Sequence, residues 1–140
     1  MSTLAAGWNE EALYAISERA YLLHTEGRFR ESLTLFEGLL EIDPENLYLR
    51  DAISAVYLTL DEPREAIRYA SGVIASSPDH TNAFLRRCEA YLRLGMSSEA
   101  ERDVEKLKDL GALGAARRME MRLATVKGKL AAQTRQRFTK

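Results

Sequence analysis

The sequence predicts an all-α protein in which consecutive helix pairs stack into a solenoid. Three observations lead to this fold class. Apolar residues recur at helical spacing along most of the 140-residue chain. The chain holds only 3 prolines and 8 glycines, so helices of ordinary length are possible. The breaks between the helical runs return every 34 residues, which indicates repeated units rather than an irregular helical bundle.

The first clear break lies in the sequence EIDPENLYL, residues 41–49. Pro44 removes a backbone donor and disfavours helix at the preceding residue, so we expect a helix to end near Ile42. The polar residues that follow can cap a new helix that begins near Leu47. Pro78 follows Pro44 by 34 residues and again separates two helical runs. Each proline therefore predicts the boundary between one helix pair and the next.

Other positions repeat with the same period. Residues of one kind recur 34 positions apart, and we call each such set a column. The turn column is Gly27, Asp61 and Gly95. The two small columns are Ala20, Ser54, Cys88 and Ser32, Ala66, Ala100, and the large apolar column is Leu39, Val73 and Leu107. Small residues are needed where helices approach closely, and large ones fill the space between adjacent units. The expected units are residues 13–46, 47–80 and 81–114.

The two ends of the chain differ from these units. Residues 1–12 are interpreted as an N-terminal cap segment, with Asn9 as the N-cap of the first helix. Residues 115–140 are expected to form an amphipathic, basic capping helix that becomes a frayed tail from Gln133 onward. Its apolar stripe comprises Ala116, Met119, Leu123, Val126 and Leu130. Such a stripe can cover the last unit of a solenoid, and it is also compatible with pairing of two chains.

The net charge of −1 conceals an uneven distribution. Residues 1–114 carry 12 Lys and Arg against 20 Asp and Glu, which is a net charge of −8. Residues 115–140 carry 8 basic residues against Glu120 alone, which is a net charge of +7. The basic end is consistent with a solvated helix or with binding to an acidic partner. No aromatic residue precedes Phe138 in this segment, so specific nucleic-acid recognition is not expected.

Composition and motifs point away from catalysis. Cys88 is the single cysteine, so no internal disulfide can form and a reducing, cytoplasmic location fits best. His24 and His80 lack the spacing to Cys88 that a zinc site or a Cys–His pair requires. No glycine-rich phosphate loop, signal peptide or membrane-spanning run is present in the sequence. We therefore expect no enzyme activity, no cofactor, no metal and no membrane span.

The sequence AYLLHTEGRFRESLTLFEGLLEIDP, residues 20–44, carries the most complete copy of the repeat. With the period of 34, it makes the chain resemble the tetratricopeptide-repeat (TPR) family over about residues 13–114. The resemblance implies a right-handed α-solenoid of three helix-turn-helix units plus a C-terminal capping helix. The second unit departs from the family pattern in having Asp61 for the turn glycine. The third unit has Ala112 in place of the closing proline.

The resemblance also implies a concave groove lined by the first helix of each unit. The groove residues expected from it are Tyr14, Glu18, Tyr21, Tyr48, Asp51, Ala55, Leu58, Leu85, Arg86, Glu89, Leu92 and Arg93. The tyrosine and leucine side chains would form a ladder of pockets for an extended peptide or a helix. Arg86 and Arg93 would be able to hold a carboxylate. Alternatively, the N-terminal segment or the tail of the protein itself fills this groove.

Two kinds of TPR protein can be weighed against this sequence. Those that grip the C-terminal carboxylate of heat-shock chaperones use a clamp of Lys, Asn and Arg. Of the matching positions Ser17, Tyr21, Ala52, Asn82 and Arg86, only Arg86 fits. The chain is similar to the small three-repeat chaperones of type III secretion translocators in its length and in RRCEAYLRLGMSSEAE, residues 86–101. It departs from them in having RDAISAVYL, residues 50–58, instead of a glycine-rich start.

The predicted function is that of a non-catalytic protein-interaction module. In this interpretation an adaptor or chaperone binds a peptide or helix of a partner protein in the concave groove. The alternative is a scaffold or oligomeric protein that acts through its C-terminal helix and basic tail, for instance as a homodimer. Partner, pathway and oligomeric state are not predicted by the sequence.

Overall fold

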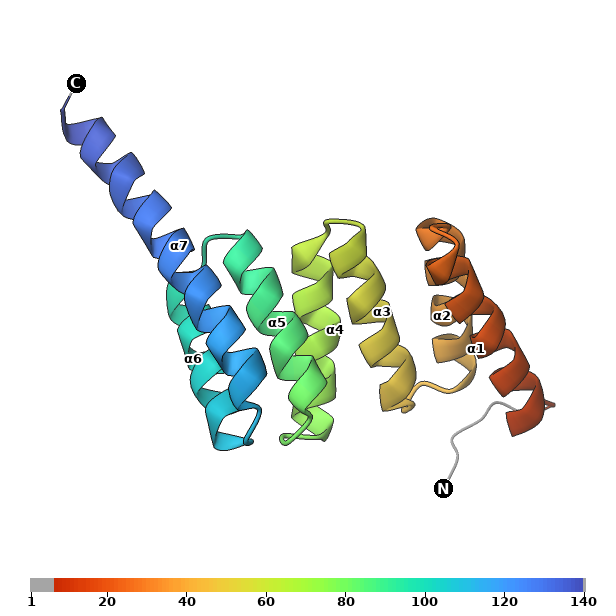
Figure 1. The fold of residues 1–140 in the computed structure, drawn as a ribbon. Helices are drawn as coiled ribbons and strands as arrows, with labels where there is room; N and C mark the ends of the chain where they lie inside the picture. The colour runs from red at the N-terminus through yellow and green to blue at the C-terminus, as the bar shows by residue number, and fades with distance from the viewer. Residues whose placement is uncertain (1–6, 140) are drawn as a thin grey trace.

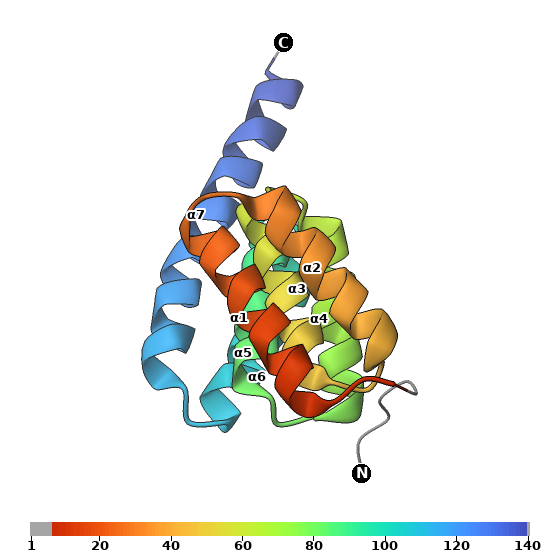
Figure 2. The same ribbon diagram turned by 90° about the vertical axis from the view of Figure 1, so that its right-hand side faces the viewer.

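A row of helix pairs makes up the fold in this computed structural model, which describes residues 7–139. The helices are α1 (Glu10–Thr25), α2 (Phe29–Ile42), α3 (Leu47–Thr59), α4 (Pro63–Ser76), α5 (Thr81–Arg93), α6 (Ser97–Asp109) and α7 (Leu113–Phe138). Three antiparallel pairs stand side by side and are followed by the longer α7 (Figure 1). Viewed from the α1 end of the row, α1 and α2 lie in front of the other helices (Figure 2). This arrangement confirms the predicted all-α solenoid with a C-terminal capping helix.

The helix boundaries follow the predicted breaks. Helix α2 ends at Ile42 and α3 begins at Leu47, with the side chain of Asn46 accepting a hydrogen bond from the Leu49 N–H at 3.2 Å. Helix α4 begins at Pro63, where a proline costs no helical hydrogen bond. Asp61 has a φ of 57°, the left-handed conformation that Gly27 and Gly95 adopt in the equivalent turns. Asp tolerates this conformation better than most residues, which explains its place in the glycine column.

Small residues bring the two helices of each pair together. All six members of the two small columns are fully buried. In each pair a small side chain donates a hydrogen bond to a carbonyl oxygen of the facing helix: Ser32 Oγ to Ala20 O (2.7 Å), Ser54 Oγ to Ala66 O (2.9 Å) and Cys88 Sγ to Ala100 O (3.5 Å). The small polar residues therefore satisfy their own hydrogen-bonding groups while allowing close approach.

The apolar core consists of two clusters. The first contains Phe36, Ile53 and other residues of α1 to α4 together with Ala90 of α5, and the second contains Val104, Leu107 and other residues of α5 to α7. The large apolar column of Leu39, Val73 and Leu107 is buried, as its period predicts. Buried apolar surface of this kind supplies most of the stabilisation of stacked helices.

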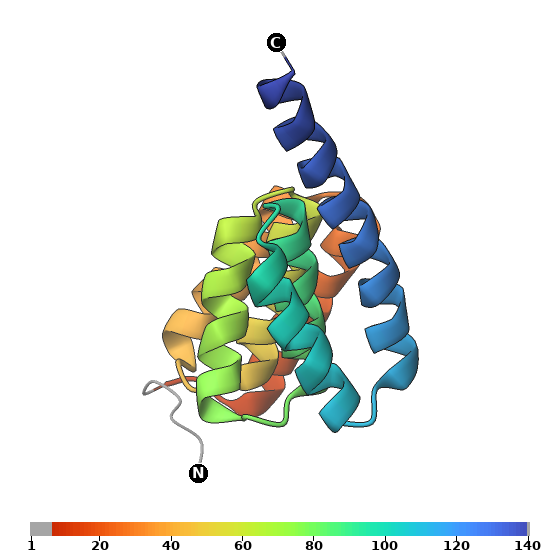
Figure 3. The same cartoon turned by 90° about the vertical axis from the view of Figure 1, so that its left-hand side faces the viewer.

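Helix α7 covers the last pair. Ala116, Met119 and Leu123 are buried against the second cluster, and Val126 packs on it partly exposed. The capping interpretation of the stripe is thus confirmed. The frayed tail expected from Gln133 is wrong, because α7 continues to Phe138 and projects beyond the other helices (Figure 3). The segment contains good helix formers and no proline, so the helix extends once it has been nucleated.

The N-terminal end of the row begins where the predicted N-cap places it. Asn9 is the N-cap of α1, as predicted, and its Oδ1 accepts a hydrogen bond from the Ala12 N–H at 2.8 Å. Helix α1 already includes Glu10, so the expected cap segment of residues 1–12 is partly helical. The remainder of that segment, residues 1–6, lies outside the described residues. Among the helices of residues 7–139, none combines the length and the apolar character that a bilayer crossing needs.

Candidate functional site

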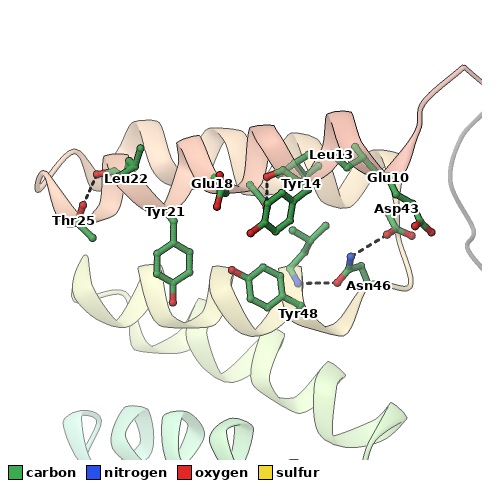
Figure 4. Close-up of a pocket in the computed structure, with 13 residues that line it drawn as sticks. Glu10, Leu13, Tyr14, Glu18, Tyr21, Leu22, Thr25, Asp43, Asn46 and Tyr48 are labelled. Atoms are coloured by element: carbon green, nitrogen blue, oxygen red, sulfur yellow. Dashed lines mark hydrogen bonds between the residues drawn. The ribbon is translucent and has the colours of Figure 1, made fainter.

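A cleft opens on the inner side of the first two helix pairs. It has a volume of about 850 Å³ and lies between α1 and α3, with α2 contributing Leu39. The rings of Tyr14, Tyr21 and Tyr48 point into the space between α1 and α3 (Figure 4). The residues that line the cleft are Glu10, Leu13, Tyr14, Ser17, Glu18, Tyr21, Leu22, Thr25, Leu39, Asp43, Asn46, Tyr48 and Leu49. Below, "the cleft" refers to this site.

The tyrosines give the cleft a large aromatic surface. Tyr14, Tyr21 and Tyr48 are 65%, 54% and 52% exposed. Tyr21 meets the buried ring of Phe36 edge to face, with ring centroids 6.5 Å apart, which fixes the position of the Tyr21 ring. Aromatic rings held in this way can bind apolar or cationic side chains without losing much conformational entropy.

The cleft exists because α1 and α3 do not close against each other. Helix α3 packs against α5, and α5 packs against α7, but α1 makes no comparable contact with α3. Ion pairs accompany the closed junctions: Arg86 donates to Asp51 at 2.8 and 3.2 Å between α5 and α3, and Arg122 donates to Glu89 at 2.9 Å between α7 and α5. The residues 34 positions before Asp51 and Arg86 are uncharged, so the first junction lacks such a pair.

Three polar contacts hold the first two pairs together away from the open side, and one of them is the ion pair of Arg30 in α2 with Glu62 at 2.5 Å. His24 Nε2 and Thr59 Oγ1 lie 3.4 Å apart, within hydrogen-bond distance, at the C-terminal ends of α1 and α3. The Tyr57 hydroxyl donates to Glu37 of α2 at 2.7 Å. The cleft is therefore bounded at one end and open along the rest of α1.

The electrostatic character of the cleft is acidic. Glu10, Glu18 and Asp43 line it, and no lysine or arginine is among the lining residues. Hydrogen bonding to the Glu18 carboxylate raises the pKa of Tyr14. Partial burial raises the pKa of Tyr48, with smaller contributions from its neighbours. Tyr14 and Tyr48 consequently stay neutral at physiological pH, and the charge of the cleft comes from its carboxylates.

A smaller hollow continues the cleft toward α5. It has a volume of about 70 Å³ and shares Tyr21 and Tyr48 with the cleft. Asp51, Ala55 and Arg86 also line it, and Arg86 is held there by Asp51. The inner face is thus wide and aromatic at the first junction and narrow and ion-paired at the second.

The predicted groove residues fall into three groups. Tyr14, Glu18, Tyr21 and Tyr48 line the cleft together. Asp51, Ala55 and Arg86 line the smaller hollow. The remaining predicted residues, Leu58, Leu85, Glu89, Leu92 and Arg93, line neither space.

Two predicted groove residues require correction. Leu58 and Leu92 are buried in the core, where Leu58 shares a cluster with Ala90 of α5 and Leu92 packs with residues of α6 and α7. The reason is the close approach of α3 to α5 and of α5 to α7, which covers the inner face near the helix ends. The equivalent residue of the first unit, His24, stays partly exposed because α1 stands apart. The apolar ladder expected along all three units is therefore confined to the first junction.

The expected carboxylate-binding arginines are already engaged. Arg86 is paired with Asp51, and Arg93 donates to the Leu58 carbonyl at 2.5 Å. Arg93 also lies 3.5 Å from Asp61 and 3.9 Å from Glu89. Binding of an external carboxylate at these arginines would require breaking internal pairs.

Several lining residues were not predicted from the sequence. Glu10, Leu13, Leu22 and Thr25 of α1 belong to the cleft. Glu10 and Thr25 stand four residues from Tyr14 and Tyr21, so helical spacing was the available signal for these two. Leu13 and Leu22 adjoin the tyrosines in sequence, and helical spacing does not mark them. Asp43 and Asn46 come from the loop before α3, which no helical pattern marks.

His80 and Cys88 have structural roles in the helices. His80 caps α5 by accepting a hydrogen bond from the Ala83 N–H at 3.2 Å. Burial raises the pKa of the Cys88 thiol to about 12. Within residues 7–139, no cluster of His, Cys, Asp and Glu is arranged to hold a metal ion.

Known proteins resemble the chain in sequence and in fold, although no family model matches it. DnaJ homolog subfamily C member 3 of Bos taurus is 31% identical over 101 residues, which cover 69% of this chain and 20% of that protein. The chain therefore spans about a fifth of the length of this curated relative. The similarity to this relative therefore concerns one segment of it and not its full length.

Solved structures superpose over most of the chain. PcrH from Pseudomonas aeruginosa has a TM-score of 0.77 at 18% identity and covers 86% of this chain and 96% of its own. PcrH has also been solved in complex with the chaperone binding region of PopD. The first TPR of Spaghetti (RPAP3), bound to the HSP90 peptide SRMEEVD, has a TM-score of 0.77 at 20% identity and covers 91% of this chain and 99% of its own. At these identities the likeness concerns the fold.

Proposed function

From the tetratricopeptide-repeat fold of the chain we propose that it is a non-catalytic interaction module. It binds a peptide or helix of a partner protein in the cleft, as an adaptor or a chaperone. The observation that carries this function is the cleft itself, where three exposed tyrosines from two helix pairs face one open space. Large rigid aromatic side chains in a concave site dominate the energetics of many protein interfaces.

Structural neighbours support a protein segment as the class of ligand. RPAP3 holds an HSP90 peptide and PcrH holds a region of PopD in their structures. The charge of the cleft bears on which protein segment it would accept. An acidic peptide would meet Glu10 and Glu18 without a free arginine to offset them, so the proposed ligand is not an acidic C-terminal peptide.

The proposed division into units follows the helix pairs. We propose that residues 13–46, 47–80 and 81–114 are three repeats and that residues 115–140 cover the third. Each range contains a first and a second helix of one pair. The opening residues of α1 precede the first range, and the first two residues of α7 belong to the third. In this division the cleft lies at the junction between the first and second repeats.

Selection from a phage-displayed random peptide library tests the proposed function. Enriched peptides are expected to lose affinity for Tyr14→Ala/Tyr48→Ala by about tenfold or more, because hot-spot aromatic residues contribute about 2 kcal/mol or more each. Met121→Ala removes an exposed apolar side chain of α7 and is the matched control. Its affinity for the same peptides should equal that of the wild type.

Circular dichroism spectra should show that both variants keep the helical fold. Enriched peptides that bind the tyrosine variant as tightly as the wild type would place the binding site elsewhere. A library that yields no enriched peptide would argue against peptide binding altogether.

A further inference from the structure

The last three turns of α7 form a largely exposed surface, with Leu130 beside the Gly95 turn. Residues 127–138 are exposed throughout, and Phe138 at the end is 84% exposed. Lys127 forms an ion pair with Glu101 at 3.2 Å, but Lys129, Arg135 and Arg137 form none within the part of the chain that the structure describes. We call residues 127–138 the tail helix.

The tail helix continues the packed part of α7, so it needs no nucleation of its own, yet its side chains stay exposed. Leu130, Thr134 and Phe138 are spaced four residues apart, so they share one face of the tail helix, with Arg137 beside it. The tail helix thus presents a strip in which the apolar side chains Leu130 and Phe138 lie on either side of Thr134, flanked by positive charge.

The cleft presents the opposite combination at the other end of the molecule. Residues 7–46 carry 9 Asp and Glu against 3 Lys and Arg, whereas residues 127–139 carry 4 Lys and Arg and no acidic residue. The aromatic lining of the cleft matches the apolar strip of the tail helix, and the carboxylates of Glu10 and Glu18 match its arginines. Complementary patches of this kind steer association and set orientation.

The two surfaces cannot meet within one chain. The free end of α7 and helix α1 stand at opposite ends of the row (Figure 1). The tail helix is about 18 Å long and α1 about 24 Å at 1.5 Å per residue, so a tail helix fits along the cleft. Contact between the two surfaces therefore requires two molecules.

We propose that the tail helix of one copy docks into the cleft of a second copy, so that copies associate head to tail. This inference goes beyond the proposed function, because it needs no partner protein. Each copy carries both surfaces, so the contact is heterologous and can repeat from copy to copy. A docked tail helix would also compete with a partner peptide for the cleft.

Size-exclusion chromatography with light scattering tests the proposal on the full chain. The average mass of the wild type is expected to rise with protein concentration at low salt. Added salt should reverse this rise because it screens the contact between the carboxylates and the arginines. The cleft variant Tyr14→Ala/Tyr48→Ala and the tail variant Arg135→Glu/Arg137→Glu should each remain monomeric.

Mixing the two variants gives the sharpest readout. The tail variant keeps an intact cleft and the cleft variant keeps an intact tail helix, so the mixture should form a complex of two chains and no larger species. Arg117→Glu/Arg118→Glu changes the same charge at exposed positions of α7 outside the tail helix and should associate like the wild type.

Three outcomes would overturn the proposal: a monomeric wild type at every concentration, association that survives in either variant, or a mixture that stays monomeric. Failure of the proposed function is recognised separately. The tail variant retains the cleft, so its binding of selected peptides reports on the cleft whether or not copies associate.

Discussion

Asp103 of α6 carries a buried charge that Arg87 of α5 neutralises. Arg87 Nε and Nη2 donate to the two carboxylate oxygens of Asp103 at 2.9 and 2.7 Å. Arg87 Nη1 also donates to Ser71 Oγ of α4 at 3.3 Å, and the guanidinium lies 5.4 Å from the centre of the Phe84 ring. One side chain thus joins three helices.

Removing the buried carboxylate should destabilise the fold. In Asp103→Ala the Arg87 guanidinium loses its partner while remaining largely buried, and we expect a loss of about 3 kcal/mol in the free energy of unfolding. Urea denaturation followed by circular dichroism measures this change. The control Arg102→Ala alters an exposed residue of the same helix and should cost less than about 0.5 kcal/mol. Equal stability of the two variants would contradict the role assigned to the pair.

The single cysteine reports on unfolding. Burial raises the pKa of Cys88 from its ordinary value of 9.0 to about 12, so the thiolate fraction at pH 8 falls about a thousandfold in the folded state. A raised thiol pKa stabilises the fold below the ordinary pKa, and this contribution is lost as the pH rises toward 12.

Labelling with a thiol reagent at pH 8 should therefore be slow in buffer and fast in urea, and its rate should follow the unfolded fraction. Rapid labelling of the native protein would show that Cys88 is accessible without unfolding.

Helix α7 has two parts with different roles. Ala116, Met119 and Leu123 belong to the buried cluster of α5 to α7, whereas residues 127–138 are exposed. A chain that ends at Val126 should keep the thermal midpoint of the full chain, because it loses no buried side chain.

A chain that ends at Gly114 should be destabilised by more than about 3 kcal/mol, since truncating a single buried Met or Leu to Ala already costs about 2–5 kcal/mol. Thermal unfolding of both truncations checks this expectation. Equal midpoints would show that α7 does not cap the row.

The elements were more predictable than the spaces between them. Pro44, Pro63 and the turn column mark helix boundaries by local backbone rules, so the sequence alone locates them. The width of each junction depends on how facing helices pack, which is a relation between distant residues. For this reason the burial of Leu58 and Leu92 and the confinement of the cleft to the first junction were not predicted.

The row as a whole is unevenly held together. Helices α3, α5 and α7 contact one another in succession, whereas α1 is attached mainly through α2. In a stacked array each unit is stabilised by its neighbours, so an end unit with fewer contacts opens more readily.

Hydrogen–deuterium exchange should reveal this unevenness. Amides of α1 are expected to exchange faster than those of α3 and α5 under native conditions. Mass spectrometry of peptic fragments measures the difference, with residues 113–126 of α7 as an end segment that is packed and should be protected. Uniform protection from α1 to α5 would contradict this expectation.

The ion pairs also bear on how such an array can lengthen by gene duplication. Arg87 and Asp103 stand within one 34-residue module, so a duplicated module would inherit the pair intact. Asp51 and Arg86 stand in successive modules, so a copy inserted between the second and third would separate them unless it supplied both partners. The first junction has no ion pair between α1 and α3 among the described residues, but Arg30 pairs with Glu62 and Tyr57 donates to Glu37 across it. A module inserted there would leave the pair of Asp51 and Arg86 intact and would enlarge the binding surface, provided that it supplied new partners for Arg30 and Tyr57.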